Sequence, residues 1–115
     1  MDSERKEMTA LELVQGQLVA YNAHDLENFC TYFSETVAVI DGRTQEVLFT
    51  GMEAFRERYQ TTFSNPKLHC HLLNRIEQDD IIIDHEEVSG ISEEVVYAIA
   101  AYQIENGLIK QVTFY

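Results

Sequence analysis

The stretch LVAYNAHDLENFCTYFSETVAVID, residues 18–41, decides how the rest of the chain is interpreted. It is typical of the end of one helix, a turn at Asn22–Asp25, a second short helix and a strand that ends on Asp41. Four apolar residues, Val37–Ile40, precede Asp41, so a strand there would deliver its carboxylate to the edge of a core. Asp before Gly is also a common turn pair. Asp41 is therefore either a turn residue or a carboxylate placed for chemistry.

The composition indicates a small acidic protein with one core. Of 115 residues, 45% are apolar, and 20 acidic against 8 basic side chains give a net charge of −12. We expect a single domain over residues 9–115, after a short flexible tail at residues 1–8. The negative charge counts against nucleic acid and anionic membrane surfaces as partners, because Lys and Arg bind both. No apolar run approaches the length of a membrane span.

The cysteines and the N-terminal residues indicate a reducing, cytoplasmic setting. Cys30 and Cys70 lie within apolar patterns without CxxC spacing, and we expect two buried free thiols. The sequence MDSERKEM is charged from the start and has no apolar region of the kind that signal peptides carry. No residue pattern indicates a cofactor.

Two helices are predicted before residue 37. Thr9 and Glu12 have the spacing of a capping box, and the helix that follows them is expected to end near residue 23. Asp25 is expected to cap the second helix, whose apolar face runs from Leu26 to Phe33.

A third helix is predicted between Gly51 and the Asn65–Pro66 pair. Its apolar residues recur at spacings of three and four and are Met52, Phe55, Tyr59 and Phe63. We interpret this stripe chiefly as core, and we keep Phe55 and Tyr59 as candidate pocket residues.

The strands are predicted from short runs of β-type residues. Residues 37–40 and 47–49 would pair as a hairpin before the third helix. Residues 68–76, 81–88, 94–104 and 108–114 follow one another through short polar connections, which is typical of antiparallel hairpins. The order of helices and then a curled antiparallel sheet predicts an α+β domain and not a βαβ one.

Several short motifs, in their order and spacing, resemble the nuclear transport factor 2-like superfamily, and more narrowly its SnoaL-like polyketide cyclases and ketosteroid isomerases. They are YNAHDL at 21–26, FSE at 33–35, TG at 50–51 and ENGLI at 105–109. The resemblance implies a cone of three N-terminal helices packed in a strongly curved antiparallel sheet, around a pocket for a small, mostly apolar molecule. It also implies a homodimer through the outer face of the sheet. The superfamily contains enzymes as well as pure binding modules.

The resemblance also implies a catalytic pattern, which this chain matches in part. Asp41 falls at the position of the isomerases' general base, a carboxylate that moves a proton next to a carbonyl group. The two donors to the developing enolate, a tyrosine and a protonated acid, correspond by spacing to Gln17 and approximately Ala100. Tyr21 lies one turn after Gln17 on the same helical face. The cyclases' acid on the final strand has no counterpart in LIKQVTFY.

A second polar cluster lies on two neighbouring predicted strands. His69, His71 and Arg75 alternate so that they share one face of their strand, and Asp84 and Glu86 share one face of the next. If residues 77–80 form the whole connection, His71 lies across from Glu86, and Arg75 lies diagonal to Asp84. A one-residue shift in register would bring other side chains to this face.

Three interpretations of this cluster remain open. It could be a polar outer sheet face or a dimer interface with ion pairs. It could line the pocket, with Arg75 anchoring a carboxylate or carbonyl group of the ligand. It could also be a metal site of two histidines and a carboxylate, if the ligands converge in space.

Two functions follow from these patterns. The first is an isomerase- or cyclase-type enzyme that uses Asp41 as general base on a small apolar carbonyl compound; the second is a non-catalytic ligand-binding or dimerisation module. A base would lie in an apolar cavity, whereas a turn residue would be solvated and bonded to its own backbone. The candidate ligand-binding residues are Gln17, Tyr21, Phe55, Tyr59, His71, Arg75, Asp84, Glu86 and Ala100.

Overall fold

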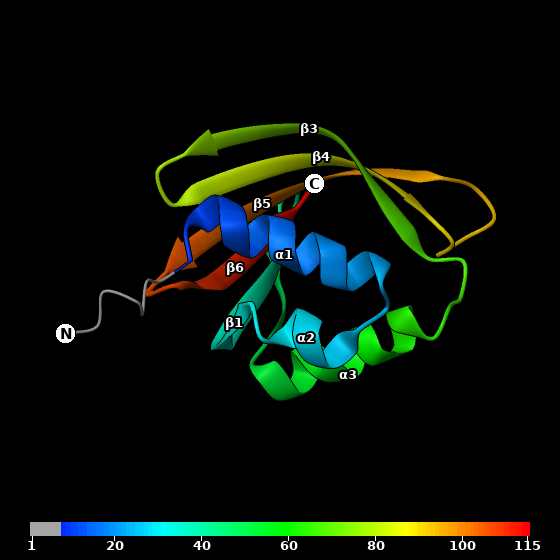
Figure 1. Ribbon diagram of the computed structural model, residues 1–115, viewed down its shortest axis with the longest axis horizontal. Helices are drawn as coiled ribbons and strands as arrows, with labels where there is room; N and C mark the ends of the chain where they lie inside the picture. Colours follow the sequence, from blue (N-terminus) through cyan, green and yellow to red (C-terminus); the bar gives the residue numbers. More distant parts are fainter. Residues whose placement is uncertain (1–7) are drawn as a thin grey trace.

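The computed structural model describes residues 8–115, so that residues 1–7 of the predicted tail lie outside the described part. It is an α+β fold with a curved six-stranded sheet, as predicted (Figure 1). In chain order the elements are α1 (Ala10–Asn22), α2 (Leu26–Cys30), β1 (Phe33–Asp41), β2 (Val47–Thr50), α3 (Met52–Phe63), β3 (His69–Gln78), β4 (Ile81–Ser89), β5 (Val96–Glu105) and β6 (Leu108–Phe114).

The sheet has the strand order β2-β1-β6-β5-β4-β3. Four of its neighbouring pairs are antiparallel, but β1 and β6 are parallel, so the sheet is mixed where the sequence predicted an antiparallel one. The helix α1 lies in the hollow of the curved sheet, and α2 and α3 lie across its open side (Figure 1). Because α3 follows β1 and β2, two of the three helices within residues 8–115 precede the sheet, and not all three as predicted. No helix within residues 8–115 is both long and apolar enough to cross a membrane.

The helix starts agree with the predicted caps. The Glu12 backbone N–H donates to Thr9 Oγ1 at 3.1 Å, and the Thr9 N–H donates to Glu12 Oε1 at 2.9 Å, which completes the capping box. The Asn28 N–H donates to Asp25 Oδ1 at 3.1 Å. Each cap satisfies N–H groups that have no partner within the helix.

The second helix is shorter than predicted. It ends at Cys30, and Phe33 is the first residue of β1, so the prediction that Phe33 continues the helical face is wrong. Phe33 pairs with Ile109 of β6, a partner distant in the sequence that local periodicity does not reveal. Its ring still packs on Phe29, with the ring centroids 4.9 Å apart.

An aromatic cluster fills the space between the helices and β1. Phe29 is 2% exposed, and its ring lies within 6 Å of the rings of Phe33, Phe55, Tyr59 and Phe63. Such pairs add to the free energy gained by burying apolar surface. Phe55 is fully buried in this cluster, as expected for a core residue. Both cysteines are buried and free, which confirms that prediction.

The hairpin of β3 and β4 differs from the predicted one. Gln78 pairs with Ile81, so the connection is a two-residue turn, Asp79–Asp80, and not the four-residue loop 77–80. Asp79 has a φ of 54°, which a tight hairpin turn requires and which Asp tolerates better than most residues.

An irregularity in β3 then changes which side chains face inward. The register shifts between Leu72 and Asn74, so Leu73 is an extra residue on this strand. His71 therefore lies across from Glu87 and is exposed, whereas Arg75 lies directly across from Asp84. The predicted pairing of His71 with Glu86 is wrong, and so is the prediction that His71 and Arg75 share a face, because the extra residue reverses the alternation.

Candidate functional site

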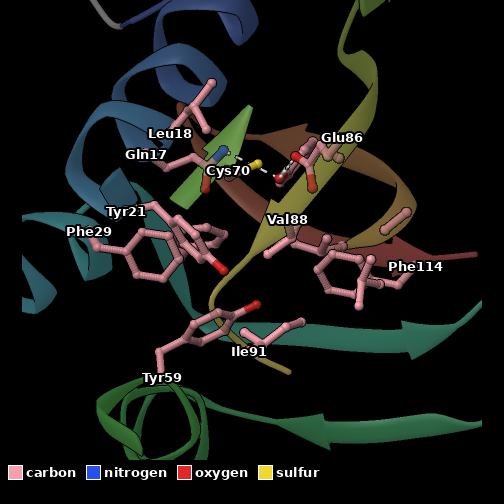
Figure 2. Close-up of a pocket in the computed structure, with 15 residues that line it drawn as sticks. Gln17, Leu18, Tyr21, Phe29, Tyr59, Cys70, Glu86, Val88, Ile91 and Phe114 are labelled. Carbon is pink, nitrogen blue, oxygen red and sulfur yellow. Dashed lines mark hydrogen bonds between the residues drawn. The ribbon is translucent and has the colours of Figure 1, made fainter. Parts of the chain in front are cut away.

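A cavity of about 270 Å³ lies between α1 and the inner face of the sheet (Figure 2). All three helices contribute to its lining, as do all strands except β2. Most of the lining is apolar or aromatic, and the polar side chains are few: Gln17, Tyr21, Tyr59, Cys70, Glu86 and Tyr102. A concave apolar site with a few convergent polar groups is the usual form of a small-molecule site.

Glu86 is the carboxyl group of this cavity. It lies on the inner face of β4 and is 6% exposed. The Tyr102 hydroxyl donates a hydrogen bond to Glu86 Oε2 at 3.3 Å. Gln17 Nε2 donates to the Tyr102 hydroxyl at 3.3 Å and to the Val14 carbonyl oxygen at 3.0 Å. A chain of hydrogen bonds therefore connects α1, β5 and β4 and orients one oxygen of Glu86.

Burial raises the pKa of Glu86 from its usual range to about 7, and the negative charge of Asp84 adds to the rise. The hydrogen bond from Tyr102, the thiol of Cys70 and the charge of Arg75 act in the opposite direction. A carboxyl group with this pKa changes its charge near neutral pH, as a group that accepts and returns a proton requires.

Two tyrosines present hydroxyl groups to the same cavity. Tyr21 from α1 and Tyr59 from α3 direct their hydroxyls into it (Figure 2), and neither hydroxyl has a hydrogen-bond partner within residues 8–115. Burial raises the pKa of both phenols above the usual value, and the Glu86 charge adds to this in each case. Both therefore remain protonated and available as donors to a ligand.

An ion pair lies beside Glu86 but outside the lining. Arg75 binds Asp84 through two hydrogen bonds, Nε to Oδ1 at 2.7 Å and Nη2 to Oδ2 at 2.9 Å, and its Nη1 donates to Gln15 Oε1 at 2.9 Å. Asp84 is fully buried and pairs across the sheet with the fully buried Ala100. The guanidinium is thus committed within the protein and does not extend into the cavity.

Asp41 lies elsewhere, at the end of β1. Its Oδ1 accepts hydrogen bonds from the backbone N–H groups of Arg43 at 2.9 Å and Thr44 at 3.3 Å, and its side chain does not line the cavity. This is the arrangement of an Asx turn. Of the two surroundings considered for Asp41, the structure has that of a turn residue.

The structure thus divides the predicted ligand-binding residues into two groups. Gln17, Tyr21, Tyr59 and Glu86 line the cavity, whereas the others lie behind it or on the outer face: Phe55, His71, Arg75, Asp84 and Ala100. Within residues 8–115 no three His, Cys, Asp or Glu side chains are arranged to hold a metal ion, and both His69 and His71 are exposed.

Tyr102 is a polar residue of the cavity that the sequence analysis did not name as a candidate. The alternation along residues 96–105 places Tyr97 and Tyr102 on opposite faces, which limits the cavity to one of them but does not say which. Tyr102 is 4% exposed and lines the cavity, whereas Tyr97 is 63% exposed. The pairing of Tyr102 with Ile82 and Val112 decides this orientation.

Comparisons with known proteins agree with this architecture. A family model described as SnoaL-like domain matches residues 14–112. No curated protein matches the chain significantly.

Solved structures with the same fold are similar over nearly the whole chain. An uncharacterised cystatin-fold protein from Novosphingobium aromaticivorans has a TM-score of 0.83 at 22% identity, over 94% of this chain and 98% of that chain. A protein from Kribbella flavida, proposed to be a ketosteroid isomerase, has a TM-score of 0.79 at 16% identity, over 94% and 78%. A protein from Pseudomonas putida, proposed to be a polyketide cyclase, has a TM-score of 0.70 at 25% identity, over 94% and 91%.

Proposed function

Because this chain belongs to the SnoaL-like domain family and has the nuclear transport factor 2-like fold, we propose that its cavity binds a small, mostly apolar carbonyl compound and transfers a proton on it. The observation that supports this most is the position of Glu86, a carboxyl group with a pKa of about 7, in an apolar cavity that also receives two tyrosine hydroxyls. The reaction class is isomerisation by acid–base chemistry.

The proposed reaction begins with the Glu86 carboxylate taking a proton from the carbon next to the carbonyl group. The electron pair of that C–H bond moves into a new carbon–carbon double bond, and the carbonyl oxygen becomes an enolate oxygen. Tyr21 and Tyr59 donate hydrogen bonds to this oxygen, where negative charge develops. Glu86 then returns the proton to another carbon of the conjugated system, which shifts the substrate's double bond and restores the carboxylate.

Tyr102 and Gln17 are the proposed positioning residues. Because Tyr102 donates to Oε2 of Glu86, Oε1 is left as the oxygen that exchanges the proton. Gln17 in turn donates to the Tyr102 hydroxyl, which favours the orientation in which Tyr102 donates toward Glu86. Both residues thus act on the substrate through the orientation of Glu86.

The role that the sequence assigned to Asp41 is therefore proposed for Glu86. The Asp41 carboxylate accepts hydrogen bonds from two backbone N–H groups of its own turn and does not line the cavity. A general base must come within hydrogen-bond reach of the proton it abstracts. Glu86 lines the cavity, so a ligand bound there can bring a proton within its reach.

The test is deuterium exchange with small β,γ-unsaturated cyclic ketones in D₂O, followed by NMR. We expect conversion to the conjugated ketone with deuterium at the carbon that receives the proton, and also at the carbon next to the carbonyl group where the first step reverses. The pH–rate profile should have its midpoint at about 7. Replacing both Tyr21 and Tyr59 by Phe should lower the rate by roughly 10²-fold or more, because donors to the developing oxyanion are lost while the rings remain.

The same experiment separates this proposal from the second candidate, a non-catalytic binding module. Ketones that bind in the cavity, detected by chemical-shift changes, without exchange above the buffer rate would refute proton transfer. Such a result would leave ligand binding as the function.

We also propose that the outer face of the sheet forms a homodimer. Ile76, Tyr97 and Ile99 are exposed on it by 64%, 63% and 40%, which supports a contact between two copies of this face. Ile99→Glu should then convert a dimer to a monomer in light scattering coupled to gel filtration. A wild-type protein that is monomeric at high concentration would contradict the proposal.

A further inference from the structure

The cavity lining is aromatic and acidic. Its aromatic side chains are Tyr21, Phe29, Phe33, Tyr59, Tyr102 and Phe114. Glu86 is its acidic residue, and no Lys, Arg or His is found among the described residues that line it. Aromatic ring faces carry partial negative charge and attract cations, most strongly where water is excluded.

The buried or partly buried charged groups at this side of the cavity are two carboxylates and one guanidinium. Asp84 and Glu86 lie two residues apart on the inner face of β4, with exposures of 0% and 6%. One guanidinium, that of Arg75, faces both, and it is bound bidentately to Asp84 with its third contact to Gln15. When Glu86 ionises, its charge therefore has no dedicated partner, and buried carboxylates are normally paired.

We propose that the cavity also binds hydrophobic amines as ammonium ions, held between the aromatic rings and the Glu86 carboxylate. The ligand supplies the positive charge that the site lacks, and its apolar substituents fill the remaining volume. This inference rests on the proposed function only in taking the cavity as a ligand site, and it does not require proton transfer.

The same arrangement excludes anionic ligands of similar shape. A carboxylate or phosphate in the cavity would meet Glu86 and aromatic ring faces without a free cation, in a protein whose net charge is −12. The site therefore discriminates by charge and not by shape: it binds an aromatic ammonium ion and rejects an aromatic carboxylate of similar size.

The pH dependence follows from the groups around Glu86. These are Asp84 on β4, Cys70 and Arg75 on β3, Tyr102 on β5, Tyr21 on α1 and Tyr59 on α3. Burial raises the pKa of the Cys70 thiol and of all three phenols, which keeps them uncharged near neutral pH. Glu86 is therefore the group whose charge changes there, so a permanent cation should bind about tenfold more tightly at pH 8 than at pH 6.

The experiment is isothermal titration calorimetry with phenyltrimethylammonium and, as its anionic counterpart, benzoate. We expect the ammonium ion to bind with the tenfold pH dependence and benzoate not to bind. Glu86→Gln should weaken ammonium binding by more than about tenfold at pH 8 and remove the pH dependence, because the amide carries no charge. Asp41→Asn is the matched control, because it removes a carboxylate that does not line the cavity and should leave the ammonium affinity unchanged.

Benzoate binding as tightly as the ammonium ion, or an unchanged ammonium affinity in Glu86→Gln, would overturn the inference. Circular dichroism at each pH confirms that the variant is folded. Ammonium binding without ketone exchange would support this inference and refute proton transfer, and exchange without ammonium binding would do the reverse.

Discussion

The end of β1 and the middle of β4 each carry a carboxylate, and the fold surrounds the two in opposite ways. At the end of β1, Asp41 accepts hydrogen bonds from Arg43 and Thr44, two and three residues further along the same chain. In the middle of β4, Glu86 meets Tyr102 from β5, Cys70 from β3 and the charge of Asp84. The first carboxylate is satisfied by its own loop, whereas the second depends on residues brought together by the whole sheet.

This difference indicates where carboxylates with raised pKa values arise in a curved sheet. A carboxylate in a turn has backbone N–H groups and solvent close by, so its surroundings resemble those in a short peptide. A carboxylate on the inner face loses water, and its pKa responds to that loss and to neighbouring charges. The predictions below test this contrast.

The largest difference is expected between the amide replacements of these two carboxylates. Glu86→Gln should lower the ketone exchange rate by roughly 10²- to 10⁴-fold, because an amide cannot accept the proton. Asp41→Asn should change the rate by no more than about twofold, since its amide oxygen still accepts the Arg43 N–H group. Both rates are measured by NMR at pH 8. An equal loss in the two variants would remove the distinction between the two regions.

A smaller effect is expected in the pH dependence of stability. The pKa of Glu86 is about 7 in the folded state against an ordinary 4.5, so the folded protein binds more protons than the unfolded chain between these values. Its free energy of unfolding therefore falls as pH rises from 4.5 to 7, by about 3 kcal/mol in total.

Urea denaturation at pH 4.5 and pH 8 measures this contribution. The wild type should lose about 3 kcal/mol of its free energy of unfolding between pH 4.5 and pH 8 through Glu86. The Glu86→Gln variant should not show this loss, because its amide does not titrate. Asp41→Asn serves as the control on the other carboxylate. Parallel pH curves for Glu86→Gln and the wild type would show that Glu86 titrates normally.

The smallest effect sharpens the contrast through a neighbour of Glu86. Tyr102→Phe removes the hydrogen bond to Oε2, which lowers the pKa of Glu86 in the wild type. The midpoint of the pH–rate profile should therefore rise above 7 by about one unit, since a hydrogen bond to a charged group contributes somewhat more than 1 kcal/mol. A midpoint that stays in place would show that Tyr102 does not stabilise the carboxylate.

Local sequence signals predicted the helices well. The capping box at Thr9 and Glu12 and the cap at Asp25 depend on residues three apart, and the structure has both. The signals failed where partners are distant. Phe33 was placed on a helix because its pairing with Ile109, a residue near the other end of the chain, is invisible in the local pattern.

The candidate site was predicted in part. Gln17, Tyr21, Tyr59 and Glu86 were named from the sequence and line the cavity. The grouping of Glu86 with His71 was wrong, because the extra residue at Leu73 turns His71 to the outer face. A single extra residue moves every later side chain of the strand to the opposite face of the sheet, and the residue types around Leu73 give no indication of it.

The sequence by itself determined what adjacent residues can decide: the helix caps and the acidic character of the chain. For Asp41 it left two interpretations open, a turn residue and a general base. Hydrogen bonds between residues that are close in the sequence do not depend on distant segments, so the residue pattern that forms them can be recognised in the sequence alone. Only the tertiary structure decided that Glu86, and not Asp41, lies in the cavity. That outcome depends on strand register and on the curvature of the sheet, which arise from pairings between distant segments.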